Sequence, residues 1–402
     1  MARILIIFLL ISVITHGTFA QCNQNTARGF MRRALYEFTT DLVVRINQET
    51  ESHFVASGLS SWTLLSAMSF GAGYETLSEL QRVLRLHPHK CFNNKFFEIL
   101  QNSANNDTTI MERSSTVYVN DKLAVHDKFK NSVEGAGLCE VKNINLDDVT
   151  QAAAIINDYV REATHEAIDE IVTAGDLDRV RMVMIDALYF RGAWKIPFPY
   201  DDTENSAFYN HLGHQIGDVN LMFVSGSFHV ISLDQIRAKV LELPYGNDGR
   251  YSMLLFLPYP DVSISNVIDS LKKINLASIY LLFEEYGQQT VHVQIPRFKI
   301  TSDINNLKEL LMDMGLRALF DSSLADFSEL TDYPLYVSNF IQKVDVEVSE
   351  EGTVAAAATE AMFEPRMMPE QFVANKPFLF MIVDKQIDVM LFTGAYSKPS
   401  IY

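Results

Sequence analysis

The first third of the chain shows mainly helical spacing of hydrophobic residues. Apolar side chains recur every three or four positions, which is the period of an amphipathic helix. One such set is Phe30, Ala34, Leu35, Phe38, Leu42 and Ile46, and a second is Ile155, Ile156, Tyr159, Val160, Ile168 and Ile171. Two more helices are predicted, one between Ser57 and Phe70 and one around Leu77, Leu80, Val83 and Leu84.

From about residue 182 onward the pattern changes to that of strands. Four apolar runs, and two runs that alternate with polar residues as a half-buried strand does, occur between here and the C-terminus. The apolar runs are Met182–Phe190 (interrupted by Asp186), Tyr251–Leu257 and the paired segments 378–383 and 387–392; the alternating runs carry Val291, Val293 and Ile295, and Val344, Val346 and Val348 against Asp345 and Glu347. Helices followed by many strands predict an α+β fold with large sheets.

The first twenty residues have the layout of a secretory signal peptide. Arg3 precedes an apolar run from Ile4 to Ile14, and small residues follow as far as Ala20, where cleavage is expected. This run is too short for a bilayer, which needs about 20 apolar residues. We therefore expect a secreted, extracellular, soluble protein with a signal peptide at 1–20. No Gly/Ser-rich or Pro-rich linker follows, so residues 21–402 are expected to form one domain.

The charge of the chain limits its partners. Its formal net charge is -17, which repels nucleic acid and anionic lipid at long range. A local group of basic residues allows two interpretations, a patch that contacts a glycosaminoglycan or an ordinary helix end and loop; it comprises Arg82, Arg85, His87, His89 and Lys90. We favour an ordinary helix end and loop there. A monomer is expected.

Three cysteines, Cys22, Cys91 and Cys139, allow at most one internal bridge and leave one thiol over. Asn106-Asp107-Thr108 is a glycosylation sequon in a secreted chain.

A search for catalytic chemistry finds little. The chain has no Gly-x-Ser-x-Gly elbow, no His-Glu-x-x-His and no Walker loop, so we predict no enzyme and no cofactor. The spacing His87-x-His89-x-Cys91 is a weak metal-ligand pattern, and the intervening Pro88 favours a plain turn. A dispersed Ser/His/Asp triad leaves no signature in one sequence, and nothing here points to one.

One stretch near the C-terminus carries the strongest signal. It runs EEGTVAAAATEAMFEPRMMPEQF, from Glu350 to Phe372. Further segments occur in a characteristic order along the chain. They are FVASGLSSWTLLSAMSFG (54–71), DALYFRGAW (186–194) with Thr203 and Phe208 after it, ELPY (242–245), SMLLFLP (252–258), PRFKI (296–300), ADFS (325–328), NKPFLF (375–380) and LFTG (391–394). Together they resemble the serpins, the serine protease inhibitor family, and most closely secreted arthropod members.

The resemblance implies a fold and a mechanism. The fold is a single domain of about nine helices and three β-sheets with an exposed reactive-centre loop, here about 350–372. A target protease attacks this loop, and the cut loop then inserts into the largest sheet before the acyl-enzyme is hydrolysed. The protease is dragged along and distorted, which traps it as a covalent complex.

The composition of the expected hinge suits insertion. The hinge comprises Glu350, Glu351, Gly352, Thr353, Val354, Ala355, Ala356, Ala357, Ala358 and Thr359. The glycine can bend where the strand becomes a loop, and small side chains can enter a packed sheet without overfilling the layer beneath. Alternate residues Thr353, Ala355, Ala357 and Thr359 would face inward. The alternative is a helix, since alanine is the best helix former, but Thr353 to Ala361 has no stripe of large apolar residues.

The resemblance also places the scissile bond. Counting forward from Gly352 and back from Asn375 both lead to Arg366-Met367, flanked by Pro365 and Met368. An arginine suits a deep pocket with a carboxylate at its base, so the expected target is a trypsin-like serine protease.

Several residues depart from the family pattern near the place where the sheet is expected to open. This sheet-opening region comprises Ser57, Ser60, Asp186 and Gln342, and Trp194 and Thr203 belong to the nearby breach region. Gly58 replaces a usual proline, Asp186 an asparagine, and Gln342 a common histidine. An ionised Asp186 only accepts hydrogen bonds, whereas Gln342 also donates them. We expect altered energetics of sheet opening rather than a different fold.

Two functions remain open from the sequence. One is an inhibitor in an extracellular cascade such as coagulation, melanisation or immune signalling, or a salivary inhibitor of a host clotting protease. The other is a serpin-fold binding, carrier or storage protein that does not inhibit. The hinge discriminates between them, because charged, bulky or proline residues there would prevent insertion, and this hinge has small side chains.

Overall fold

The computed structural model describes residues 21–102, 109–304, 306–351 and 369–402, and the structural statements below concern these residues. They form nine α-helices, four 3-10 helices and fifteen strands. The α-helices are α1 (Gln24–Glu49), α2 (Gly58–Met68), α3 (Tyr74–Val83), α4 (Lys90–Asn102), α5 (Asp127–Gly135), α6 (Val149–Ala163), α7 (Ile264–Asp269), α8 (Leu276–Tyr286) and α9 (Leu307–Asp313). The 3-10 helices are η1 (Gly175–Leu177), η2 (Tyr200–Asp202), η3 (Leu271–Lys273) and η4 (Ala318–Phe320).

The strands form three sheets. The five-stranded sheet, called the large sheet below, has the order β11 (Phe298–Ile304), β12 (Asn339–Val348), β4 (Met182–Gly192), β2 (Thr109–Asn120) and β3 (Glu140–Ile144). The six-stranded sheet has the order β1 (Phe54–Ala56), β15 (Val389–Tyr396), β14 (Phe378–Asp384), β9 (Tyr251–Pro258), β8 (Ala238–Pro244) and β7 (Val230–Leu233). The four-stranded sheet has the order β13 (Glu370–Val373), β10 (Gln289–Pro296), β6 (Gln215–Phe228) and β5 (Glu204–Tyr209).

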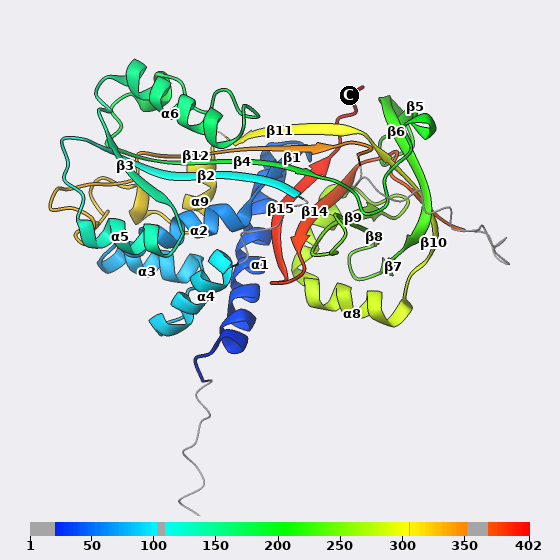
Figure 1. Cartoon of the computed structure of the whole chain (residues 1–402), viewed down its shortest axis with the longest axis horizontal. Coiled ribbons are helices and arrows are strands. Elements are labelled where there is room, and N and C mark those ends of the chain that lie inside the picture. The colour runs from blue at the N-terminus through cyan, green and yellow to red at the C-terminus, as the bar shows by residue number, and fades with distance from the viewer. Residues whose placement is uncertain (1–20, 103–108, 305, 352–368) are drawn as a thin grey trace, which may run out of the picture.

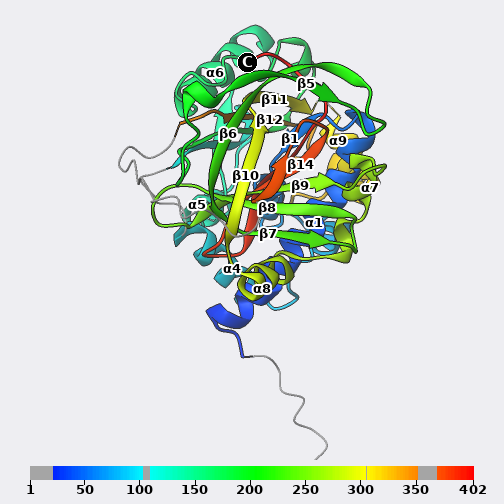
Figure 2. The same cartoon turned by 90° about the vertical axis from the view of Figure 1, so that its right-hand side faces the viewer.

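The large sheet is covered on both faces. In Figure 1, α6 lies above it and α2, α3, α5 and α9 lie below. After a quarter turn, β6 and β10 pass in front of β7, β8 and β9 (Figure 2). The predicted α+β fold with helices first and large sheets afterwards is therefore confirmed, and the core joins all three sheets into one domain.

Burial on both faces explains the continuous apolar run of β4. Met182, Met184 and Leu188 join the main core, which includes α2. Val183, Ile185 and Ala187 point to the other face and belong to a second, smaller core with residues of α6. A strand covered on both sides needs no polar face, so its hydrophobic residues do not alternate with polar ones.

The predicted helix starting near Ile155 is shorter than its apolar repeat. Helix α6 ends at Ala163, and His165 and Glu166 have positive φ angles of 47° and 65°, which a continuing right-handed helix excludes. Ile168 and Ile171 are buried beside α6, but from the segment that follows it.

Two residues that the apolar pattern placed on the buried face of a helix are exposed. Ile155 is 42% exposed, because the sheet-facing stripe of α6 is Ala152, Ile156 and Val160. Phe30 is 43% exposed and packs at the end of α1 against a histidine and a phenylalanine rather than in the core.

Asp345 was expected on the polar face of a half-buried strand, but it is buried. The neighbouring strand β11 closes over it, because Thr301 Oγ1 donates to its carboxylate at 2.8 Å and Lys299 Nζ lies 3.2 Å away. Burial raises the pKa of Asp345, although both neighbours oppose that rise.

The centre of the large sheet contains a parallel pair of strands. Strands β4 and β12 are direct neighbours, paired from Asn339 opposite Val183 to Glu347 opposite Arg191. After β12 the described chain continues to Glu351 and resumes at Pro369, where β13 adds to the four-stranded sheet parallel to β10. The chain thus leaves the large sheet at the end of β12 and next forms a strand of a different sheet.

None of the described helices combines the length and apolarity that crossing a bilayer requires.

Candidate functional site

The four predicted residues of the sheet-opening region come together beneath β4 and β12. Gln342 of β12 pairs in register with Asp186 of β4. Its amide oxygen accepts the Ser57 N–H at 3.1 Å. Its amide nitrogen lies 3.0 Å from the Ser57 carbonyl oxygen, 2.9 Å from Ser61 Oγ and 2.7 Å from Asp186 Oδ2. One side chain of β12 therefore contacts both α2 and β4.

Asp186 is fully buried and surrounded by donors. Ser60 Oγ and Ser115 Oγ each lie 2.5 Å from its Oδ1. Ser57 caps α2, since its Oγ accepts the Ser60 N–H at 3.2 Å and donates to the Leu391 carbonyl at 2.7 Å. Because a carboxylate only accepts hydrogen bonds, this set of hydroxyl and amide donors suits aspartate where the family pattern has asparagine.

Sequence reasoning missed three members of this cluster, namely Arg113, Ser115 and Ser61. Arg113 Nε donates to Ser115 Oγ at 2.7 Å, and both residues lie on β2, two positions apart and so on one face. The signal in the sequence was the polar run Glu112–Thr116, which lies in the middle of β2. Nothing local linked that run to Asp186.

The breach region lies at the C-terminal ends of β4 and β12. Trp194 Nε1 donates to the Ser349 carbonyl at 2.7 Å, and its backbone N–H donates to the Glu351 carbonyl at 3.0 Å. Its ring stacks on Tyr245 with centroids 4.3 Å apart. Burial raises the pKa of Tyr245 far above its ordinary range. These contacts join the segment that follows β12 to the chain that follows β4.

Glu350 is the last fully buried residue before the undescribed segment, with 1% of its surface exposed. Its Oε1 accepts from Thr203 Oγ1 at 2.8 Å and lies 3.3 Å from the Arg297 guanidinium. Its backbone carbonyl accepts the Phe198 N–H at 3.2 Å. Thr203 was predicted in this region, whereas Arg297, within the motif PRFKI, was not assigned a role.

Arg85, the residue in the middle of the predicted basic cluster, is paired with two carboxylates of α1. Arg85 Nε lies 2.5 Å from Glu37, and its terminal nitrogen lies 2.7 Å from Asp41. Arg82 stands in the last turn of α3, and Lys90 begins α4. The favoured interpretation, a helix end and loop, agrees with this geometry.

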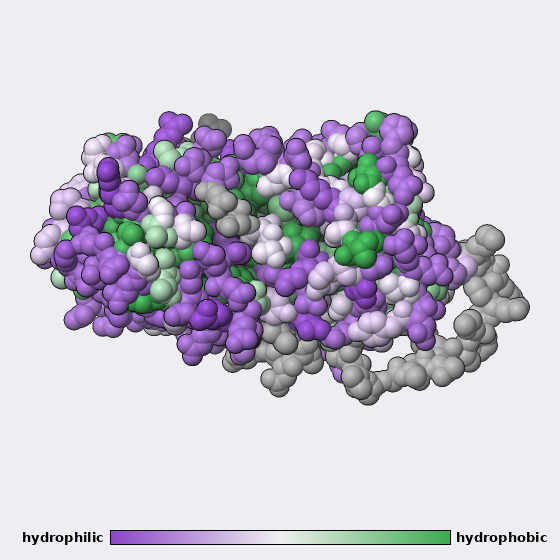
Figure 3. All heavy atoms as spheres, turned by 90° about the horizontal axis from the view of Figure 1, so that it is seen from above, coloured by the Kyte–Doolittle hydropathy of each residue, from purple (hydrophilic) through white to green (hydrophobic). Residues whose placement is uncertain are grey.

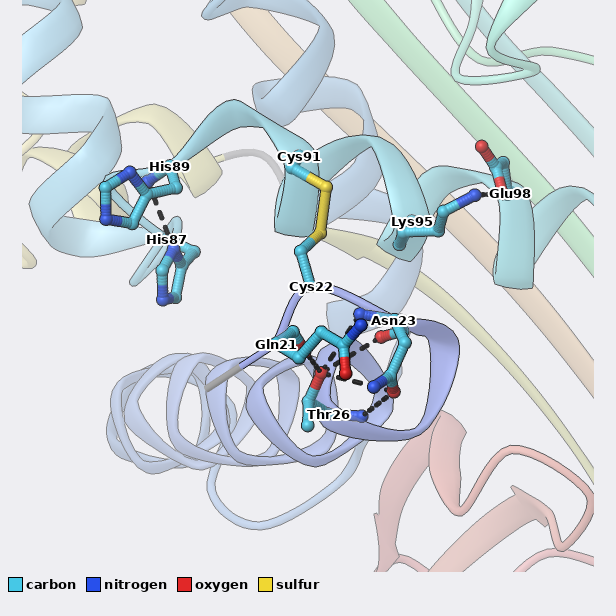
Figure 4. Close-up of a disulfide and its surroundings, with 9 residues drawn as sticks. All are labelled: Gln21, Cys22, Asn23, Thr26, His87, His89, Cys91, Lys95 and Glu98. Atoms are coloured by element: carbon cyan, nitrogen blue, oxygen red, sulfur yellow. Dashed lines mark hydrogen bonds and ion pairs between the residues drawn. A yellow bond between two sulfur atoms is a disulfide. The ribbon is translucent and has the colours of Figure 1, made fainter. Parts of the chain in front are cut away.

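The structure contains one disulfide among the described residues. Cys22 is bonded to Cys91, which ties the start of α1 to α4 (Figure 4). His87 and His89 lie to one side of this bridge, and the Cys91 sulfur is consumed by it. No group of metal-ligating side chains is found in the described ranges. Cys139 is the free thiol there, and burial raises its pKa to about 12.

Several predicted residues lie outside the described residues. They are the hinge from Gly352 to Thr359 (Gly352, Thr353, Val354, Ala355, Ala356, Ala357, Ala358 and Thr359), the reactive bond Arg366–Met367 with its neighbours Pro365 and Met368, the signal peptide and Asn106. Their roles stay predictions.

The face seen in Figure 3 is largely hydrophilic, with small separate hydrophobic patches.

The described residues form nine α-helices and three sheets, with the parallel strands β4 and β12 adjacent in the large sheet and β13 in a different sheet. This is the architecture of a serpin. A family model described as serpin (serine protease inhibitor) matches residues 33–399. The chain belongs to the serpin family, whose members are described as inhibitors of serine proteases rather than as catalysts.

Individual relatives agree with this assignment. The chain is 28% identical over 401 residues to serine protease inhibitor 2 of Anopheles gambiae, covering 96% of this chain and 93% of that protein. It is 28% identical over 367 residues to plasminogen activator inhibitor 1 of Bos taurus, covering 89% of each. Among solved structures, Serpin48 of the insect Tenebrio molitor is 26% identical with a TM-score of 0.76, covering 91% of this chain and 97% of that one.

Proposed function

We propose that this protein is a secreted inhibitor that traps a trypsin-like serine protease as a covalent acyl complex. Cleavage occurs at Arg366–Met367, and the released loop inserts between β4 and β12. The observation that carries the proposal is the pairing of these two strands. They are parallel and adjacent in a sheet whose other described pairs are antiparallel, except β2 with β3.

The topology favours a new strand at this position. The loop begins just after the end of β12, so a loop that folds back runs antiparallel to β12. Because β4 is parallel to β12, the same loop is antiparallel to β4 as well. Insertion therefore replaces one parallel pair by two antiparallel pairs, and antiparallel pairing is slightly more stable per residue. The sheet gains a complete strand without changing any other partner.

The extended loop is long enough to run the whole length of the large sheet. Residues 352–366 span roughly 50 Å when extended, at about 3.4 Å per residue. Strand β4 has 11 residues, which corresponds to about 36 Å. A fully inserted loop thus carries Arg366, with the attached protease, past the far end of the sheet.

The breach region has to yield when insertion begins. The bonds from Trp194 to Ser349 and Glu351 close the space between the ends of β4 and β12. Glu350 is held by Thr203 and Arg297 and gives the loop a fixed base. Insertion breaks some of these contacts, but it adds about a dozen backbone hydrogen bonds at about 0.5–1.5 kcal/mol each. The resulting ~5–20 kcal/mol is comparable to the stability of a whole domain and can drive the distortion of a protease.

The proposed setting is an extracellular protease cascade, such as coagulation, melanisation or immune signalling. Arg366 selects proteases with an acidic specificity pocket. The Cys22–Cys91 bridge supports secretion, because disulfides persist in oxidising compartments. Glycosylation at Asn106 and a monomeric state belong to the same proposal. A non-inhibitory binding or carrier role is the alternative.

The test uses trypsin and a denaturing gel. Wild-type protein should form an adduct that survives denaturation, together with a C-terminal peptide beginning at Met367. Arg366→Ala should lose the adduct. Cleavage of wild-type protein without any adduct would overturn the inhibitory proposal in favour of the binding or carrier role.

A matched pair of hinge variants tests the insertion step. Ala357→Arg places a long charged side chain on the face expected to point inward, whereas Ala356→Arg places it outward. We expect the inward variant to be cleaved without adduct, since a charge would be buried under the sheet. The outward variant should still form the adduct. Equal behaviour of the two variants would contradict insertion as an alternating strand.

A further inference from the structure

A fully buried carboxyl group, that of Asp186, lies on the central strand of the large sheet. Asp186 has no exposed surface, and its nearest side-chain partners are the neutral groups of Ser60, Ser115 and Gln342. Hydroxyl and amide donors can satisfy the carboxylate oxygens, but they do not neutralise the charge. A buried charge without a counter-charge is strongly unfavourable.

Arg113 supplies a positive charge to the same network. Two hydrogen bonds, of 2.7 Å from Arg113 Nε to Ser115 Oγ and 2.5 Å from Ser115 Oγ to Asp186 Oδ1, connect the two charged groups. The proton positions follow from chemistry. Because the carboxylate cannot donate, the single hydroxyl proton of Ser115 points to Asp186, and the Ser115 lone pair accepts the guanidinium N–H.

The environment of Arg113 agrees with this pairing. Burial lowers the pKa of the Arg113 guanidinium, and the charge of Asp186 is the largest effect that opposes the decrease. The second contact of the guanidinium is a neutral one, a 3.3 Å hydrogen bond to the Leu138 carbonyl. This contact fixes the guanidinium against the connection between α5 and β3.

The position of the pair relative to the opening sheet matters. Ser115 pairs directly with Asp186 across the antiparallel β2–β4 ladder. Gln342, in contrast, approaches Asp186 from β12, across the boundary at which a new strand would enter. When β4 and β12 separate, Asp186 loses Gln342 but keeps Ser115 and Arg113.

We propose that Arg113 is the counter-charge of Asp186 in both the closed and the opened sheet. Because it keeps this carboxylate compensated while the sheet opens, Arg113 is a positioning residue for that step. This inference rests on the proposed trapping function for the opened state only. The aspartate and the arginine then act as one unit. Each is costly without the other, and removal of both charges restores a neutral cluster.

A double-mutant cycle tests the pair in the uncleaved protein, independently of inhibition. Arg113→Met should raise the unfolded-to-folded ratio at a fixed urea concentration about tenfold or more in the wild-type background, and less than about threefold in the Asp186→Asn background. Arg179→Met, whose side chain is 91% exposed, is the control and should change little in either background. Equal costs of Arg113→Met in both backgrounds would overturn the inference, because a purely packing role does not depend on residue 186.

The opened sheet is tested by the trypsin gel. In the Arg113→Met variant, the fraction of inhibitor that is released as cleaved protein, rather than trapped with trypsin, should be severalfold higher than in wild type. Adding Asp186→Asn to this variant should return that fraction toward the wild-type value. An increase that Asp186→Asn does not reverse would refute the role in opening. If wild-type protein forms no adduct, the trapping function fails, while the urea cycle still decides the pairing. If Arg113→Met does not fold, recovery of folding in the double variant supports the pairing and its absence refutes it.

Discussion

Gly58 offers a direct test of how closely α1 packs on α2. It is the first residue of α2, after the capping residue Ser57, a position at which proline is normally favourable. A Cβ atom at this position would lie 2.3 Å from Thr39 Oγ1 and 2.7 Å from both Thr39 Cβ and Cγ2. Thr39 lies on α1 and is buried, so it has little room to move. The departure from the family's proline therefore has a steric reason.

The expected magnitude follows from two opposing effects. Replacing a helical glycine by alanine normally stabilises a protein by about 0.5–1 kcal/mol. Overfilling a packed core costs about 1–3 kcal/mol. We expect Gly58→Ala to destabilise the protein by about 1–2 kcal/mol net, and Gly58→Pro by at least as much.

The matched control is Gly29→Ala. Gly29 lies within α1, and a Cβ there would meet no atom within 4 Å, so this variant should be stabilised by about 0.5–1 kcal/mol. Urea unfolding midpoints of the uncleaved protein measure both changes. Thr39→Ala should recover part of the loss in the Gly58→Ala background, because it removes two of the three close atoms. If Gly58→Ala raised the midpoint as much as Gly29→Ala, the steric argument would be refuted.

Three further perturbations probe charge and covalent constraint. Glu350→Gln retains an acceptor but loses its charge, and should lower the unfolding free energy by about 1–3 kcal/mol in urea titrations; an unchanged midpoint would argue against an ionic anchor. Burial raises the pKa of Glu242, but Lys385 and a neighbouring histidine produce a net decrease. The stability from this group is therefore present above its unfolded pKa and lost as pH falls through the folded value, so Lys385→Met should shift acid unfolding, followed by circular dichroism, to higher pH. Cys22→Ser should lower stability by about 4 kcal/mol, from the loop entropy of the 69-residue separation, in the same urea assay.

Local pattern was sufficient for much of the fold. The period of the apolar residues predicted α1, α2 and α3, and the apolar runs predicted β4 and β9. The pattern was insufficient where a neighbour covers a polar position. Asp345 looked like the exposed side of an alternating strand, yet β11 places Thr301 and Lys299 over it. Whether such a position is exposed depends on the adjacent strand, and the period of one strand contains no information about that.

The sequence by itself indicated the change from helix-rich to strand-rich segments and the resemblance to the serpins, and it gave the predicted hinge and reactive bond, because these follow from short motifs and their spacing along the chain. Only the tertiary structure decided which distant residues meet. It brought Arg113 to Asp186 through Ser115, Arg297 to Glu350, and Thr39 against Gly58. Such contacts depend on how strands are registered and how helices pack. That geometry results from the whole core at once, so no short stretch of the chain encodes it.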